Sequence, residues 1–286
     1  MIDLSGVRFT RRDVGGVTLH VAEAGPDDGP LVILLHGFPE FWFGWRHQIG
    51  ALAAAGFHVV APDQRGYNLS DKPRGIAPYD IDILASDVVA LAAHYTDGPF
   101  NLVGHDWGAL VAWWVATRTP EKLRRLAVLN CPHPQVWRDA MRRDPAQRRA
   151  SWYVGAFQIP RLPELLMRAG DCRALVAALR QSTTPLGDPD AERYREAWQQ
   201  PGALTAMVNW YRAAARHRFA PVMPGSLRMP VRIIWGRKDP YLVPALAAAS
   251  KTLCAGADLI ELPEATHWVA HDQPGRVNAL LLEFLA

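Results

Sequence analysis

The chain has 286 residues, of which 49% are hydrophobic and 21% are charged, and this is typical of one large globular domain with room for an insertion. Its formal net charge is +3 and its basic residues are largely dispersed, which argues against a nucleic-acid partner. The three cysteines, Cys131, Cys172 and Cys254, are odd in number, far apart and without metal-ligand spacing, which argues against disulfides and against a zinc site.

The first half of the chain alternates between short apolar runs and helical segments. Runs at residues 7–12 and 17–22 flank a Gly15-Gly16 turn, which predicts an antiparallel hairpin. Continuous apolar runs at residues 31–35 and 57–61 predict strands that are buried on both faces, with a helix between them. The next helix, strand, helix and strand are expected, in this order, at residues 81–94, at 100–105, directly after Asp106 and at 126–129.

The same alternation returns near the C-terminus after an interruption. Its strands and helices are expected at residues 231–235, from about Val243, at 258–262 and at 277–285. Residues 132–220 lack strand runs and are rich in proline, arginine, alanine and aromatic residues, which indicates an inserted helical lid. We therefore predict an α/β fold, in which residues 1–131 and 221–286 form a mostly parallel, doubly wound sheet domain.

Asp106 stands at the most informative position of the chain. It lies between a buried strand and an apolar helix, in the run Gly104-His105-Asp106-Trp107-Gly108. This pattern is typical of a nucleophile elbow, with aspartate where most such elbows carry serine. An aspartate carboxylate can attack an electrophilic sp³ carbon and become a covalent alkyl ester. The elbow therefore predicts an enzyme that opens carbon–oxygen or carbon–halogen bonds.

A histidine and a second acid follow at the ends of later strands. On sheets of this kind the nucleophile, the acid and the histidine come in that order along the chain. Asp239 follows the strand at 231–235, and His267 follows the strand at 258–262. His271 is the nearest rival, but it adjoins the start of the last helix and is expected to be structural. Asn130 occupies an alternative position for the acid, and its amide excludes that role.

The expected base activates water rather than the nucleophile, because Asp106 is already ionised at neutral pH with a reference pKa of about 3.9. His267 suits that step, and Asp239 would fix its tautomer and stabilise the imidazolium. Two backbone amides are expected to hold the tetrahedral oxyanion. One is that of Trp107, after the nucleophile, and the other is that of Phe38, in the loop after the strand at 31–35.

The runs that carry these residues resemble those of the epoxide hydrolases of the α/β-hydrolase superfamily, and the similarity covers nearly the whole chain. The matching runs are HGFPEFWFGWRHQI, APDQRGYNLSDKP, GHDWGALVAWW, NWYR, GRKDPYLVP and THWVAHDQP. The resemblance implies an α/β-hydrolase fold with a lid, an aspartate nucleophile at Asp106, and neither a cofactor nor a metal. One departure is Asn68, where many relatives carry a second glycine, and it concerns the local geometry of that loop.

Two tyrosines of the expected lid match the family's lid motifs. Tyr153 stands four residues before Phe157-Gln158, and Tyr211 lies in the run Asn209-Trp210-Tyr211-Arg212. Opening an epoxide releases an alkoxide whose conjugate acid has a pKa comparable to water's ~15.7, so a phenol with a pKa near 10 is a useful proton donor. A halide needs only weak N–H donors. The two tyrosines therefore favour an epoxide as the substrate.

Three other residues of the expected lid are informative. Tyr194 is flanked by charged residues and is expected on a solvated helix face. Gly155 and Ala156 are smaller than the residues expected at this point in the family, which predicts a wider pocket.

We expect a cytoplasmic, cofactor-independent epoxide hydrolase that forms a vicinal diol. Residues 1–13 lack the apolar core of a secretory signal, and no stretch approaches the length of a membrane span. The expected partner is a small-molecule epoxide, with no nucleic-acid or membrane partner, and the chain is expected to be a monomer or a homodimer. Two alternatives remain open. One is a haloalkane or haloacid dehalogenase that uses Asp106, with the Trp107 indole binding halide, and the other is a non-catalytic ligand-binding homologue.

Overall fold

A single sheet organises the computed structural model, which describes residue 4, residues 6–184 and residues 186–286. Within that part of the chain the sheet has eight strands in the order β1-β2-β4-β3-β5-β6-β7-β8. Their bounds are β1 Arg8–Asp13, β2 Thr18–Ala24, β3 Leu31–Leu35, β4 His58–Pro62, β5 Phe100–His105, β6 Leu123–Leu129, β7 Val231–Gly236 and β8 Ala257–Leu262. The pairs β1·β2 and β2·β4 are antiparallel and all others are parallel. The predicted mostly parallel α/β fold is confirmed.

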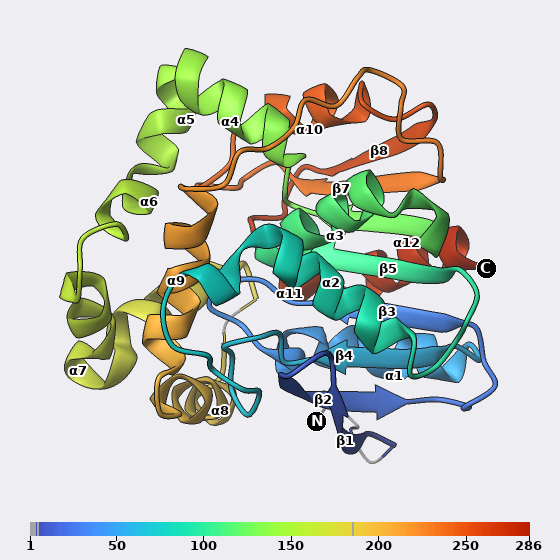
Figure 1. Cartoon of the computed structure of the whole chain (residues 1–286), viewed down its shortest axis with the longest axis horizontal. Helices are drawn as coiled ribbons and strands as arrows, with labels where there is room; N and C mark the ends of the chain where they lie inside the picture. Colours follow the sequence, from blue (N-terminus) through green and yellow to red (C-terminus); the bar gives the residue numbers. More distant parts are fainter. Residues whose placement is uncertain (1–3, 5, 185) are drawn as a thin grey trace.

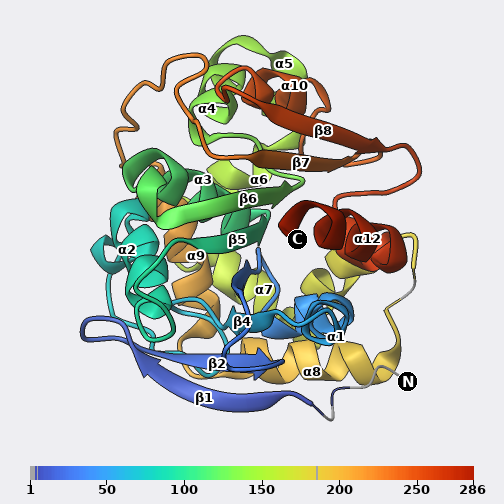
Figure 2. The ribbon, with the colours of Figure 1, turned by 90° about the vertical axis from the view of Figure 1, so that its right-hand side faces the viewer.

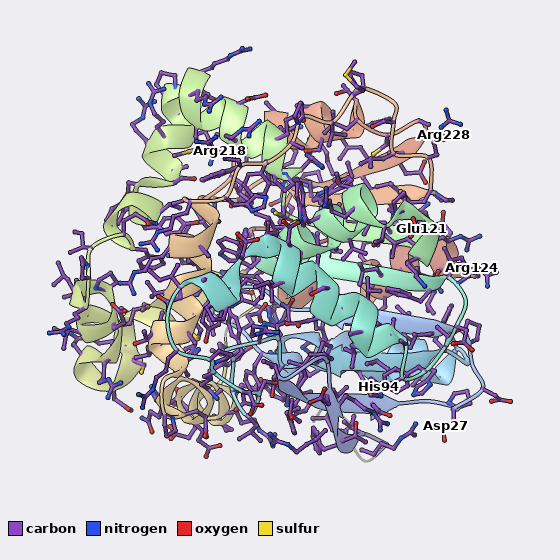
Figure 3. All side chains as sticks on the ribbon, in the orientation of Figure 1. Asp27, His94, Glu121, Arg124, Arg218 and Arg228 are labelled. Carbon is purple, nitrogen blue, oxygen red and sulfur yellow. The ribbon has the colours of Figure 1, made fainter. Side chains whose placement is uncertain are left out.

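Helices cover both faces of the sheet. They are α1 Arg46–Ala54, α2 Ile81–Ala92, α3 Trp107–Arg118, α10 Ala245–Lys251, α11 Val269–Asp272 and α12 Pro274–Leu285, with short 3-10 turns at Trp42–Trp45, Ala77–Tyr79 and Pro120–Lys122. Helices α1 and α12 pack on one face, and α2 and α3 pack on the other (Figure 2). Strands β3 to β5 are fully buried, as their continuous apolar runs predict. Charged side chains such as Arg124 and Asp27 lie at the periphery (Figure 3).

Six further helices, here called the lid helices, follow one another between β6 and β7 at one end of the sheet (Figure 1). They are α4 Pro134–Arg143, α5 Pro145–Ala150, α6 Trp152–Ala156, α7 Leu162–Leu179, α8 Asp188–Gln199 and α9 Ala203–Ala214. Helix α7 is interrupted, because residues 169–172 have non-helical backbone angles. Among the described residues, no helix has the length and apolar composition needed to cross a bilayer.

The turn between β5 and α3 is strained and tightly packed. Asp106 has φ 49° and ψ −121°, in the region that side chains other than glycine rarely adopt. The glycines on either side allow the close approach. A Cβ on Gly104 would lie 2.6 Å from the Ala109 backbone, and one on Gly108 would lie 2.1 Å from the carbonyl oxygen of Leu35. The elbow is therefore fixed by glycine at both positions.

Asn68 retains a glycine-like backbone conformation in the loop after β4. Its φ is 41°, which asparagine tolerates better than most residues. Its amide donates to Asp63 Oδ2 at 2.8 Å, and the same carboxylate oxygen contacts His20 Nδ1 at 2.7 Å. Asparagine thus takes the left-handed backbone conformation at this position, and its side chain is held by Asp63.

Substituting alanine for Gly108 should destabilise the fold, since the new Cβ would meet the Leu35 carbonyl at 2.1 Å. We expect the free energy of unfolding in urea to fall by about 2–3 kcal/mol, as for other overpacked sites. Gly155→Ala is the matched control, because a Cβ there meets nothing within 4 Å and alanine is favoured over glycine in a helix by roughly 1 kcal/mol. Equal stability of the two variants would contradict this account.

Candidate active site

The structure brings together three predicted site residues from the ends of three strands. Asp106 follows β5, Asp239 follows β7 and His267 follows β8. His267 Nδ1 lies 2.7 Å from Asp239 Oδ2, and its Nε2 lies 3.4 Å from Asp106 Oδ2. The His267 and Asp239 side chains are buried, and 16% of the Asp106 side chain is accessible. Asp106 is therefore the most accessible of the three side chains.

Backbone and amide donors hold Asp239 in place. Its Oδ1 accepts from the backbone N–H groups of Tyr241 and Leu242 at 2.7 and 3.0 Å, and its Oδ2 accepts from Asn130 Nδ2 at 2.7 Å. Asn130 in turn accepts from the N–H of Gly236 at 2.7 Å. Asn130 therefore positions the acid rather than serving as one.

The loop after β3 approaches Asp106 from the other side. The N–H of Phe38 donates to Asp106 Oδ1 at 2.8 Å. A Cβ on Gly37 would lie 2.4 Å from the Asp106 Cβ, so only glycine fits there. The Trp107 N–H belongs to the first residue of α3 and therefore has no acceptor within the helix. The Phe38 N–H therefore contacts the Asp106 carboxylate directly, and the role of both amides as oxyanion donors stays a prediction.

The charges of the three residues depend on one another. Burial raises the pKa of Asp106, but the hydrogen bond and the charge of His267 outweigh burial and the pKa is lowered. Burial lowers the pKa of His267, but Asp239 and Asp106 raise it to about 10 through charge and hydrogen bonding. At neutral pH the site therefore holds an imidazolium between two carboxylates.

The two predicted lid tyrosines lie above Asp106. Tyr153 comes from α6 and Tyr211 from α9, and their ring centroids are 6.1 Å apart. Tyr211 packs edge-on against Trp107, at 4.7 Å between ring centroids. Burial raises the pKa of both phenols well above the usual value, and the negative charge of Asp106 acts in the same direction. Both tyrosines are therefore protonated at neutral pH.

Two cavities meet at Asp106, Tyr153 and Tyr211, which line both of them. The larger, about 470 Å³, also reaches His267 and runs between the lid residues Leu162 and Leu175. The smaller, about 110 Å³, lies on the other side, and its lining is mainly apolar. Its lining includes Trp107, Leu110, Cys131, Trp137 and Phe219. The Asp106 carboxylate thus lies where the two cavities join.

Tyr194 was expected on a solvated face, and this prediction is wrong. Its side chain is fully buried, and its hydroxyl donates to Glu40 Oε1 at 2.9 Å. The charged neighbours that suggested exposure occupy the outer face of α8, whereas Tyr194 faces the loop after β3. Glu40 Oε1 also lies 2.6 Å from His271 Nε2. His271 therefore lies outside the Asp106 cluster, in a buried contact with Glu40.

Sequence reasoning missed Tyr241, which follows Asp239 by two residues. Its ring packs edge-on against His267 with 5.2 Å between centroids, and it lines the larger cavity. Its hydroxyl donates to Gln181 Oε1 at 2.9 Å. Of the two small residues expected to widen the pocket, Ala156 lines the larger cavity, whereas Gly155 is exposed. Only proximity to Asp239 along the chain could have indicated Tyr241.

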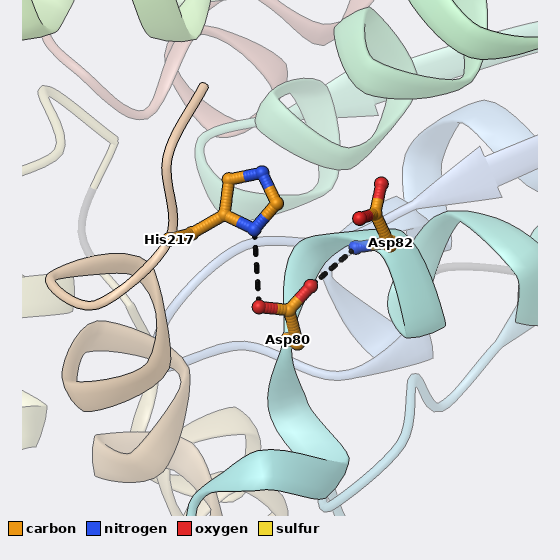
Figure 4. A group of neighbouring side chains, drawn as sticks. All are labelled: Asp80, Asp82 and His217. Carbon is orange, nitrogen blue, oxygen red and sulfur yellow. Dashed lines mark hydrogen bonds and ion pairs between the residues drawn. The ribbon is translucent and has the colours of Figure 1, made fainter. Parts of the chain in front are cut away.

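Asp80, Asp82 and His217 are the group in the described residues with metal-ligand spacing, since their ligand atoms lie within 4.8 Å of one another (Figure 4). Each already has a protein partner. His217 Nδ1 lies 3.1 Å from Asp80 Oδ2, and the other Asp80 oxygen accepts from the N–H of Asp82 at 3.0 Å. Asp82 Oδ1 accepts from the Trp114 indole at 2.7 Å. The group thus connects the end of α9 to the start of α2.

The raised pKa of His267 makes its contribution to stability depend on pH. Since the pKa is about 10 in the folded chain against an ordinary value of 6.5, the contribution is fully present below pH 6.5 and is lost as the pH rises through about 10. The difference in unfolding free energy between wild type and His267→Gln should therefore shrink from pH 6 to pH 10, by on the order of a few kcal/mol. Surface His94→Gln serves as the control, and a pH-independent difference would contradict the charge assignment.

Comparison with known proteins identifies the family. Residues 30–274 match the family model of the alpha/beta hydrolase fold. The chain is 46% identical to the AB hydrolase superfamily protein YfhM of Bacillus subtilis, over 99% of both chains. It is 35% identical to epoxide hydrolase 4 of Mus musculus, over 97% of this chain and 79% of that protein. A structure of a mutant epoxide hydrolase from Bacillus megaterium, complexed with its naphthyloxy-propanediol product, matches with a TM-score of 0.88 and 33% identity, over 96% of this chain and 99% of that one. The chain is a hydrolase that belongs to the epoxide hydrolases of the α/β-hydrolase superfamily.

Proposed function

We propose that the chain opens epoxides through a covalent ester on Asp106 and hydrolyses this ester to release a vicinal diol. The observation that carries the proposal is an ionised carboxylate, on a strained elbow, that faces two protonated tyrosines across a cavity. The diol bound to the related Bacillus megaterium enzyme supports the same class of product.

In the first step a carboxylate oxygen of Asp106 attacks an epoxide carbon, and the carbon–oxygen bond of the ring breaks. Tyr153 and Tyr211 hold the ring oxygen, and one of them gives it a proton. Their raised pKa values do not oppose this transfer, because the alkoxide that develops has a conjugate-acid pKa comparable to water's ~15.7. The tyrosines keep their protons until the ring opens.

Ester formation changes the charge of His267. The new ester is neutral, so one of the two carboxylates that raise the pKa of His267 is lost. The pKa of the imidazole falls, and His267 can release its proton, which replaces the one given up by the tyrosine. The neutral imidazole is then available as a general base, still oriented by Asp239 at 2.7 Å.

In the second step His267 removes a proton from water, which attacks the carbonyl carbon of the ester. The tetrahedral oxyanion is stabilised by the N–H groups of Phe38 and Trp107. Collapse of this intermediate breaks the bond between the carbonyl carbon and the alkyl oxygen. The departing alkoxide takes the proton of the new Asp106 carboxylic acid, and the diol is released. One oxygen of the regenerated Asp106 carboxylate therefore comes from water.

The ester should accumulate when the base is removed. We expect His267→Gln, mixed with styrene oxide, to gain the mass of one epoxide on the peptide that contains Asp106, because attack needs no base whereas hydrolysis does. Asp106→Asn is the matched control and should gain no mass. In wild type, a single turnover in ¹⁸O water should place the label in Asp106. Label found only in the diol would contradict the covalent route.

Removing the proton donors should slow the first step. We expect Tyr153→Phe and Tyr211→Phe each to lower kcat/KM for styrene oxide by roughly 10²-fold or more, and the double variant to be inactive. Tyr241→Phe is the control, because it removes a hydroxyl of the same cavity that donates to Gln181. We expect this variant to lower kcat/KM by less than about tenfold. Halide release from haloalkanes, measured in parallel, tests the dehalogenase alternative. Full activity of the double tyrosine variant would exclude the acid role.

A further inference from the structure

Exposed apolar side chains gather around the opening of the larger cavity. Eight large apolar side chains are exposed in the described residues, and five of them lie between positions 152 and 166. Their exposed fractions are Trp152 72%, Leu165 64%, Leu166 61%, Ile159 46% and Leu162 44%. All but Leu165 also line the larger cavity. The apolar surface is therefore continuous with the interior of the site.

The segment that carries these side chains is also rich in arginine, and Arg161 and Arg168 line a neighbouring cavity together with Leu165. Residues 145–168 contain four arginines and one acidic residue, Glu164. Glu164 is neutralised by the buried Arg212, at 2.7 and 3.1 Å. No ion pair engages Arg149, Arg161 or Arg168 within the part of the chain that the structure describes, and all three are exposed. The charge of this surface is thus uncompensated.

The whole lid segment has the same excess of arginine over acidic residues. Residues 132–220 carry fourteen arginines, no lysine and eight acidic residues, whereas the rest of the chain is net acidic. Helices α5, α6 and α7 lie along the outer edge of the lid, at the left of Figure 1. The five apolar residues together with Arg148, Arg149, Arg161 and Arg168 are here called the entrance rim.

We propose that the entrance rim docks on an anionic lipid bilayer. An exposed tryptophan and leucines enter the interfacial region of a bilayer, and arginines beside them attract anionic headgroups. A second copy of the chain is a poorer partner, because two entrance rims of the same uncompensated positive charge repel each other. A contiguous exposed apolar patch with a polar border is typical of such an interaction site.

Docking places the opening of the larger cavity against the bilayer. A lipophilic epoxide then reaches Asp106 from the bilayer without crossing water. This delivery of substrate rests on the proposed function, whereas docking on the bilayer does not. The sequence predicts no membrane partner because it lacks a long apolar stretch. The entrance rim is instead assembled from α5, α6, the loop after α6 and the first turns of α7.

Co-sedimentation with sucrose-loaded vesicles tests the docking. We expect binding to phosphatidylcholine vesicles that contain about one quarter phosphatidylglycerol, and at least tenfold weaker partitioning onto pure phosphatidylcholine or in 0.5 M salt. No binding to the anionic vesicles, or equal binding to both kinds, would overturn the proposal. Light scattering measures the oligomeric state in parallel. A dimer that dissociates when residues of the entrance rim are substituted would show that a second copy of the chain covers this surface, and would overturn the proposal.

Paired variants locate the binding surface. Trp152→Gln with Leu165→Gln, and Arg161→Gln with Arg168→Gln, should each lower partitioning by roughly tenfold. The matched controls are Leu69→Gln with Met223→Gln, which are exposed apolar residues outside the rim, and Arg124→Gln with Arg228→Gln, on the side away from the lid (Figure 3). Circular dichroism and Tm verify folding. Controls that weaken binding as much as the rim variants would refute the assignment.

Discussion

One buried imidazolium shared by the carboxylates of Asp239 and Asp106 is the interaction on which the site depends. His267 is held at 2.7 Å from Asp239 and 3.4 Å from Asp106, and both acids raise its pKa, to about 10, against the effect of burial. Parallel strands make the arrangement possible, because their carboxyl ends meet at one edge of the sheet. Asn130 and two backbone amides then fix Asp239. The fold thus supplies the geometry, and the charges supply the state that reacts.

The lid is seated by hydrogen bonds to the loops that carry the site. The Trp198 indole donates to the carbonyl of Pro39 at 2.6 Å, and the Trp210 indole donates to that of Arg65 at 3.0 Å. Tyr194 adds a bond to Glu40, on the loop that also carries Phe38. Tyr211 is next to Trp210 in the sequence. The contacts that hold the lid on the sheet domain therefore also position Tyr211 relative to Asp106.

Much of the fold follows from local patterns in the sequence. Buried strands have continuous apolar runs, so β3 and β5 could be predicted from the sequence. The elbow requires glycines on both sides, and these can be recognised in the sequence, so Asp106 could be predicted as well. The prediction for Tyr194 was wrong because charged neighbours do not by themselves identify the solvent-exposed face of a helix. That face is known only once the element packed against the opposite face is known. Tyr241 and the entrance rim could not be predicted, since both depend on which segments the lid brings together.

The unequal chambers on the two sides of Asp106 have a stereochemical consequence. About 470 Å³ is open on one side and about 110 Å³ on the other, and both share the same carboxylate and phenols. For an oxirane with one bulky and one small substituent, the bulky substituent fits the larger chamber while the ring oxygen faces Tyr153 and Tyr211. Mirror-image substrates then present different carbons to the attacking oxygen. Under the proposed mechanism, the unequal chambers thus favour one mirror-image form of such a substrate over the other.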